Sequence, residues 1–202
     1  MSSPTVVVLL HYFLFLVQSA PVGRPSDPPP TFTAATERVK TLVEKILRDI
    51  PAAHRAAVTT AGLTLDPSGQ TANLQMMVTS LGIPSPPVLK PPSELFTLEV
   101  CVSHMAAGGR LYRGLLGVLS DRVGGLSDLR ADLRDLLTHI TKMKEAARLG
   151  GGEDQNPGPD LASRLHGNYE VQVAAHLTLT QLRSFCHDLI RSLRAVATYR
   201  PR

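Results

Sequence analysis

The chain has 202 residues, of which 43% are hydrophobic and 4% aromatic, and it contains no tryptophan. This length and composition predict one domain whose core consists of aliphatic side chains, as in an all-helical bundle. The net charge of +4 results from 21 Lys and Arg against 17 Asp and Glu. Because this excess is small, we expect no nucleic acid as a partner.

An uninterrupted apolar segment, VVVLLHYFLFLV, extends from Val6 to Val17. It has the length of a signal-peptide core and is shorter than the ~20 residues of a membrane-spanning helix. We therefore expect residues 1–19 to be a cleaved signal peptide and the mature protein to be secreted, without membrane insertion. An uncleaved anchor is the alternative. The proline-rich residues 20–31 are predicted to form a flexible leader, and residues 32–199 a helical domain.

Apolar residues at spacings of three and four predict a first helix that begins at Thr33. Pro51 is expected to end this helix, because proline lacks the backbone N–H that a helix interior requires. A long connection over residues 51–92 follows. Within it, NLQMMVTSL at residues 73–81 predicts a short helix.

Ser93 is the expected N-cap of a second helix, which the apolar spacing extends over residues 93–123. Glycine lowers helix stability by about 1 kcal/mol relative to alanine. A close neighbour or a kink is therefore the expected reason for the glycines inside this helix. They are Gly108, Gly109, Gly114 and Gly117.

A strict heptad pattern predicts a third helix over Leu126–Ala147. After the glycine-rich residues 150–159, a last helix is predicted from Asp160 to about Thr198, with a bend expected near Gly167. Its segments EVQV and HLTLT alternate like a strand, which leaves the local structure ambiguous. The connection lengths permit an up-up-down-down bundle, although an up-down bundle satisfies the periodicity equally well.

Residues 81–122, LGIPSPPVLKPPSELFTLEVCVSHMAAGGRLYRGLLGVLSDR, provide a more specific signal. This segment resembles the granulocyte colony-stimulating factor family, of the interleukin-6 superfamily of long-chain helical cytokines, in LGIP, Cys101 and LYRGLLGVL. The resemblance continues through Leu126–Ala147 and covers most of residues 33–198. The chain looks like a non-mammalian vertebrate member of this superfamily. The resemblance implies an all-α, up-up-down-down bundle and a secreted growth factor that assembles a class I cytokine receptor to drive granulocyte-lineage proliferation and differentiation.

The resemblance also implies two receptor-binding surfaces. The first, on the first and third helices, comprises Glu44, Lys45, Arg48, Asp132 and Asp135. We expect its two aspartates, three residues apart, to share one exposed face. The second, on the short helix and the start of the last one, comprises Asn73, Met76 and Leu161. Asn73 departs from the family, which commonly has an acid there.

The two cysteines, Cys101 and Cys186, are candidates for one disulfide in an oxidising compartment. In an up-up-down-down bundle the second and last helices are antiparallel neighbours, and the expected offset of about 6 Å along their axes lies within boundary error. Two buried free thiols are the alternative. The family's usual partner for the cysteine of the second helix falls at Pro91, so that pairing is absent here.

A basic row on the last helix suggests heparan sulfate as a further partner, although a solvated face explains the row as well. It consists of Arg183, His187, Arg191 and Arg194. We find no catalytic, metal-binding or phosphate-binding motif, so we expect neither an enzyme nor a cofactor. A secreted amphipathic-helix lipid carrier is the alternative function, but such proteins tend to contain internal repeats, which this sequence lacks.

Overall fold

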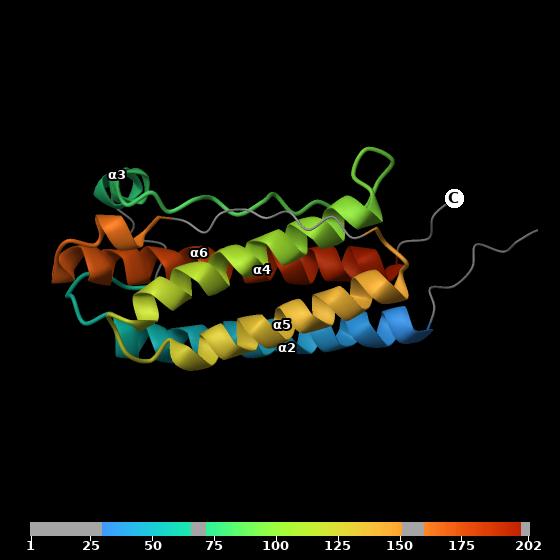
Figure 1. The fold of residues 1–202 in the computed structure, drawn as a ribbon, viewed down its shortest axis with the longest axis horizontal. Coiled ribbons are helices and arrows are strands. Elements are labelled where there is room, and N and C mark those ends of the chain that lie inside the picture. Colours follow the sequence, from blue (N-terminus) through green and yellow to red (C-terminus); the bar gives the residue numbers. More distant parts are fainter. Residues whose placement is uncertain (1–29, 66–71, 151–159, 199–202) are drawn as a thin grey trace, which may run out of the picture. The chain divides into compact units, whose positions relative to one another are not determined.

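The computed structural model describes residues 30–65, 72–150 and 160–198, and all of its regular structure over these residues is helical. Four long helices form a bundle (Figure 1). They are α2 (Pro30–Ala57), α4 (Leu98–Ser120), α5 (Ser127–Ala146) and α6 (Asn168–Thr198). The predicted signal peptide and most of the leader lie outside the described residues. Within the described part of the chain, we find no helix with both the length and the hydropathy needed to span a membrane.

The bundle has the up-up-down-down arrangement that was predicted. Helices α2 and α4 run in one direction, and α5 and α6 run in the opposite direction (Figure 1). Both α2 and α4 pack against both α5 and α6, so every close neighbour is antiparallel. A shorter helix, α3 (Ala72–Ser80), packs on α6. The long connections that precede α4 and α6 provide the length that this topology requires.

Helix α2 is longer than predicted at both ends. It begins at Pro30, inside the predicted leader, where proline is favoured as the first helical residue. It also continues through Pro51 to Ala57, so the prediction that Pro51 ends it was wrong. Ala53 and Ala57 are buried beyond this proline. Burial of the last turn therefore offsets the one backbone hydrogen bond that Pro51 cannot donate.

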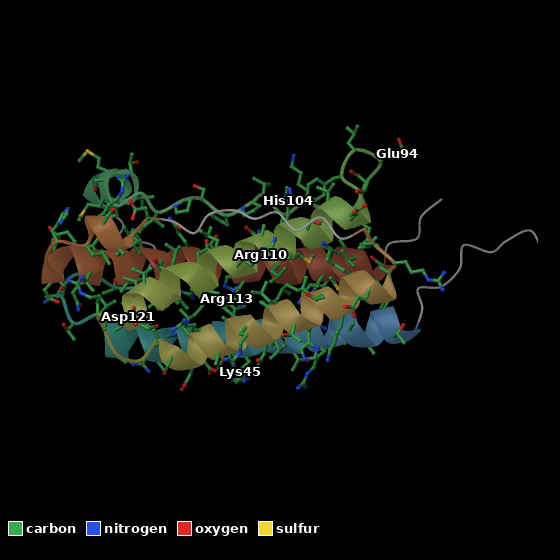
Figure 2. The ribbon with its side chains drawn as sticks, viewed as in Figure 1. Lys45, Glu94, His104, Arg110, Arg113 and Asp121 are labelled. Carbon is green, nitrogen blue, oxygen red and sulfur yellow. The ribbon has the colours of Figure 1, made fainter. Side chains whose placement is uncertain are left out.

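Helix α4 begins at Leu98, five residues later than predicted. Its N-cap is Thr97, whose side-chain hydroxyl accepts a hydrogen bond from Val100 N at 3.3 Å. Ser93 instead closes the preceding turn, where its hydroxyl accepts a hydrogen bond from Phe96 N. Glu94 lies in this turn and Asp121 directly follows the helix (Figure 2). By contrast, α5 matches its predicted boundaries to within one residue.

Two of the four glycines in α4 allow close approach of a neighbouring helix, as expected. A Cβ atom at Gly108 would lie 2.3 Å from the Phe185 ring of α6, and one at Gly109 would lie 3.0 Å from Leu137 of α5. At Gly117 a Cβ atom would meet only the Arg130 side chain, at 3.6 Å, which is ordinary van der Waals contact. Packing therefore explains Gly108 and Gly109 but not Gly117.

Helix α6 resolves the ambiguous segment in favour of a helix. It begins at Asn168, eight residues later than predicted, and a separate short 3-10 turn, Ala162–Arg164, precedes it, so the chain is interrupted near Gly167 where only a bend was expected. Every residue from 171 to 179 is buried, because α2, α3 and α4 all pack on α6. A helix covered on all sides needs no polar face. Strand-like alternation therefore carries no information about the fold in this segment.

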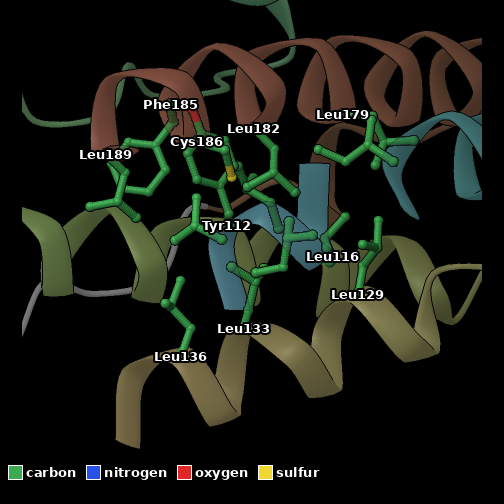
Figure 3. Packing of buried hydrophobic residues seen from close by; sticks show 14 of the residues in the cluster. Tyr112, Leu116, Leu129, Leu133, Leu136, Leu179, Leu182, Phe185, Cys186 and Leu189 are labelled. Carbon is green, nitrogen blue, oxygen red and sulfur yellow. The ribbon is translucent and has the colours of Figure 1, made fainter. Parts of the chain in front are cut away.

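Leucine is the most frequent core residue in α4, α5 and α6 (Figure 3), and α2 adds Val39, Val43, Ile46 and Ile50. Tyr112 and Phe185 contribute its largest aromatic contact, with ring centroids 5.3 Å apart. Both side chains are at least 98% buried. Aliphatic layers with few aromatic residues are what the composition predicted.

The predicted disulfide between Cys101 and Cys186 is not formed, and both cysteines are buried free thiols. The contact of Gly108 with Phe185 sets the register of α4 against α6. Cys101 lies seven residues before Gly108, so it is displaced by about 10 Å along the axis from the level of Cys186. A disulfide requires Cα atoms about 4.4–6.8 Å apart. Burial raises the pKa of Cys101 to about 11 and that of Cys186 to about 12.

Candidate functional site

An ion pair joins α2 to α5 at the surface predicted to bind a receptor. Lys45 Nζ lies 2.5 Å from Asp132 Oδ2, and 3.1 Å from Asp49 Oδ2 on its own helix. Hydrogen bonding to Asp132 is the main reason that the pKa of Lys45 is raised. Lys45 therefore remains protonated at neutral pH and its charge is held between two carboxylates.

Asp132 and Asp135 do not share one exposed face, contrary to expectation. The Asp132 side chain is only 13% exposed, whereas that of Asp135 is 58% exposed and lies 3.7 Å from Arg134. Positions three apart on a helix differ by about 60° in direction. This rotation is enough to turn Asp132 toward α2 while Asp135 faces solvent.

Two more of the predicted residues border this pair on α2. Glu44 is exposed. The Arg48 side chain is 73% exposed, and its Nε atom lies 3.9 Å from Asp49 Oδ1. All five predicted residues of the first surface lie on α2 or α5, and the structure brings two of them, Lys45 and Asp132, into contact. Four of them expose much of their side chains, whereas Asp132 is largely buried and holds Lys45 through the ion pair.

A shallow groove between α2 and α5 adjoins the ion pair. Its floor is small and apolar, and its rim holds charged side chains. The lining comprises Lys45, Asp49, Ala52, Ala53, Ala56, Gly125, Asp128, Leu129, Ala131 and Asp132. Gly125 has a φ of +81°, and a Cβ atom there would lie 2.5 Å from Ala56. This glycine therefore allows the α4–α5 connection to pass close to α2. With three carboxylates and one ammonium group on its rim, the groove suits a side chain with an aliphatic stem and a positive end.

Only part of the second predicted surface is exposed and can contact a partner. Met76 on α3 is 67% exposed, but Leu161 is fully buried and cannot contact a partner in this conformation. The side chain of Asn73 lies outside the described residues. Tyr169, in the first turn of α6, is 55% exposed and adds an exposed aromatic side chain that the sequence pattern did not indicate. An aromatic residue beside Gly167 and Asn168, in a chain with 4% aromatic residues, was the available signal.

The short helix that carries Met76 is anchored to the segment before α6. Arg164 Nη1 donates a hydrogen bond to Ser80 O at 2.9 Å. Gly82, with a φ of +64°, lies against the same arginine side chain. Helix α3, which contains Met76, thus lies at the end of the bundle where α6 begins (Figure 1).

The basic row on α6 interacts mainly within the chain. Arg183 Nη1 donates a hydrogen bond to Leu65 O at 3.2 Å, and Arg191 forms an ion pair with Asp188. Two of the three arginines are therefore already engaged, which reduces what the row offers to an anionic partner.

A histidine pair that no sequence pattern indicated links α2 to α6. His54 Nε2 lies 3.0 Å from His176 Nδ1, and both side chains are at least 94% buried. Burial is the main cause that lowers the pKa of each, followed by Arg55 for His54 and by His54 for His176. At neutral pH one ring therefore donates to the other. Over the described residues, no group of three His, Cys, Asp or Glu side chains could hold a metal ion.

Comparisons with known proteins agree with this architecture. No protein-family model matches the chain. Human granulocyte colony-stimulating factor is 29% identical over 196 residues, which cover 95% of this chain and 91% of the human protein. Bovine granulocyte colony-stimulating factor is 27% identical over 128 residues, which cover 61% of this chain and 65% of the bovine protein. The resemblance to granulocyte colony-stimulating factor that the sequence carries in its second and third helices is thus confirmed, and it extends over nearly the whole chain.

Proposed function

We propose that the protein is a secreted cytokine that binds and assembles a class I cytokine receptor of the granulocyte colony-stimulating factor receptor type. Its proposed effect is proliferation and differentiation of granulocyte-lineage cells. The similarity to granulocyte colony-stimulating factor and the helical bundle support a cytokine. The main observation in support of the receptor proposal is the Lys45–Asp132 ion pair, because it links the two helices, α2 and α5, that carry the predicted charged residues.

The first receptor contact is proposed to use the exposed charges around this ion pair. Glu44 and Arg48 on α2 and Asp135 on α5 supply them. Charges on such a surface steer association and select the partner, and those that become buried on binding contribute most to affinity. Asp132 is proposed to act through Lys45, by holding it in place, and not by direct contact with the receptor.

The second contact is proposed to use the end of the bundle where α3 covers the start of α6. Met76 and Tyr169 expose apolar surface there, and methionine and tyrosine are both enriched in protein interfaces. Two separate surfaces on one molecule are what assembly of two receptor chains requires.

Titration against a soluble receptor ectodomain tests the first contact. Asp135→Ala is expected to weaken binding about thirtyfold, the loss typical of a charge buried at an interface. Glu145→Ala, which removes an exposed acid near the C-terminal end of α5, serves as the matched control and should leave the affinity unchanged. Equal affinities for the two variants would contradict the assignment of this surface.

A lipid carrier remains the alternative function, and it predicts a different result. Such a protein must expose its apolar helix faces to lipid, whereas a cytokine keeps them in its core. Here the leucines of α4, α5 and α6 in Figure 3 are at least 99% buried. We expect the protein to stay free when it is mixed with phosphatidylcholine vesicles. Co-sedimentation with the vesicles would favour the carrier.

A further inference from the structure

A second groove lies between α4 and α5, and it shares the lining residue Ala131 with the groove beside Asp132. Its lining is basic and contains small residues. It comprises Arg113, Gly114, Gly117, Ser120, Ser127, Arg130, Ala131 and Arg134. None of these described lining residues is acidic. The groove therefore has the charge opposite to that of the groove beside Asp132.

The three arginines of this groove are available to a ligand. All three are exposed. Arg134 lies 3.7 Å from Asp135 in an exposed ion pair, which is a weak interaction in water. In the described part of the chain, neither Arg113 nor Arg130 has a carboxylate within 4.0 Å. This contrasts with the basic row on α6, where Arg183 and Arg191 are engaged.

Glycines in α4 keep the groove open. The Arg130 guanidinium group lies over Gly117, where a Cβ atom would be 3.6 Å from Arg130 Nε. Packing does not require glycine at this position, yet a larger side chain would occupy the space that the arginines border. The groove thus accounts for Gly117, which helix packing leaves unexplained.

We propose that this α4–α5 groove binds the sulfate groups of a glycosaminoglycan chain. A guanidinium group presents paired N–H donors that match two oxygens of a sulfate group. Arg130 and Arg134 lie one turn apart, or about 6 Å along α5, and Arg113 faces them from α4. A linear polymer with successive sulfate groups can pair with all three guanidinium groups at once, and contacts linked in this way strengthen one another. The proposal rests on the secretion proposed above, because such polymers are extracellular.

Binding of a heparin-derived octasaccharide, measured by calorimetry on the full chain, tests the proposal. The variant with Arg113→Gln, Arg130→Gln and Arg134→Gln is expected to lose at least about tenfold in affinity. The matched control replaces Arg183, Arg191 and Arg194 of α6 by Gln and removes the same net charge. It should lose less than about threefold. Equal losses would show that net charge alone drives binding, and a larger loss in the control would place the site on α6. Either result overturns the proposal.

A third variant separates shape from charge. Gly117→Leu keeps all three arginines but fills the groove, and we expect it to weaken octasaccharide binding at least about fivefold. Unchanged affinity in this variant would overturn the groove as the site. Binding to phosphatidylserine vesicles without binding to the octasaccharide would overturn the proposal in favour of a lipid headgroup.

The two proposals can fail separately. Receptor-ectodomain affinity is measured on a variant with Arg113→Gln and Arg130→Gln alone, because Arg134 pairs with Asp135 of the first proposed receptor contact. It is expected to stay within about twofold of the original protein, since neither of these two arginines belongs to a proposed receptor contact. If the arginine variant loses octasaccharide binding but keeps receptor binding, the result supports the glycosaminoglycan site and leaves the receptor proposal unaffected. A protein that binds the octasaccharide but no receptor ectodomain would contradict only the proposed cytokine function.

Discussion

Lys45 of α2 and Asp132 of α5 are 87 residues apart in the chain and form an ion pair with an N–O distance of 2.5 Å. The pair connects the two helices that carry the first proposed receptor contact. The exposed charges Glu44 and Asp135 lie near it in sequence, one residue before Lys45 and three residues after Asp132.

A double-mutant cycle on Lys45→Ala and Asp132→Ala tests whether this pair stabilises the bundle. The Lys45 side chain is 43% exposed, so solvent screens the interaction. We expect a coupling free energy of about 0.5–1 kcal/mol from urea unfolding. Lys45→Ala with Asp49→Ala is the comparison cycle, since both residues lie on α2. A coupling of zero between Lys45 and Asp132 would mean that the pair does not link the helices in solution.

The His54–His176 pair predicts a loss of stability in mild acid. Burial lowers the pKa of both histidines below 6.5, so the folded state takes up protons less readily than the unfolded state. Stability is therefore full above the unfolded pKa and falls as the pH drops below it. We expect the free energy of unfolding to fall by about 1–3 kcal/mol between pH 7.5 and pH 5.5.

Urea unfolding of the variant with His54→Gln and His176→Gln checks the origin of this effect. Gln residues can share a hydrogen bond but do not titrate, so most of the pH dependence should disappear. His166→Gln, which replaces an exposed histidine, should keep it. If the double variant retained the full pH dependence, other groups would have to be responsible.

Two substitutions in α4 that add the same methyl group are expected to have opposite effects. Gly108→Ala brings a Cβ atom into the Phe185 ring and should destabilise the protein by about 1–3 kcal/mol through overpacking. Gly117→Ala meets only ordinary contact with Arg130 and should stabilise it by up to about 1 kcal/mol through helix propensity. Thermal unfolding measures both. A stabilised Gly108→Ala variant would contradict the close contact of α4 with α6.

Both cysteines are expected to be inaccessible free thiols in the native protein. Burial raises the pKa of Cys101 to about 11 and of Cys186 to about 12, so the reactive thiolate is scarce at neutral pH. A thiol-specific reagent should label neither cysteine in the folded protein and both after unfolding without reductant. Unreactive cysteines in the unfolded protein would indicate a disulfide.

Much of the architecture was determined by the sequence itself. The heptads of α5 predicted its limits to within one residue, because one apolar stripe of a helix must face the core. The end of α2 was not predictable in this way. Pro51 is a local signal to stop, and burial of Ala53 and Ala57 by other parts of the chain overrides it.

Side-chain partners were decided only by the tertiary structure. The sequence identified Asp132 and Asp135 as a pair of acids on α5, but the rotation of that helix against α2 buries one and exposes the other. The register of α4 against α6, set by Gly108 and Phe185, separates the two cysteines by about two helical turns along the axis. Periodicity specifies which face of a helix is buried. It contains no information on axial shift or rotation between helices, since these depend on how side chains from distant segments interlock.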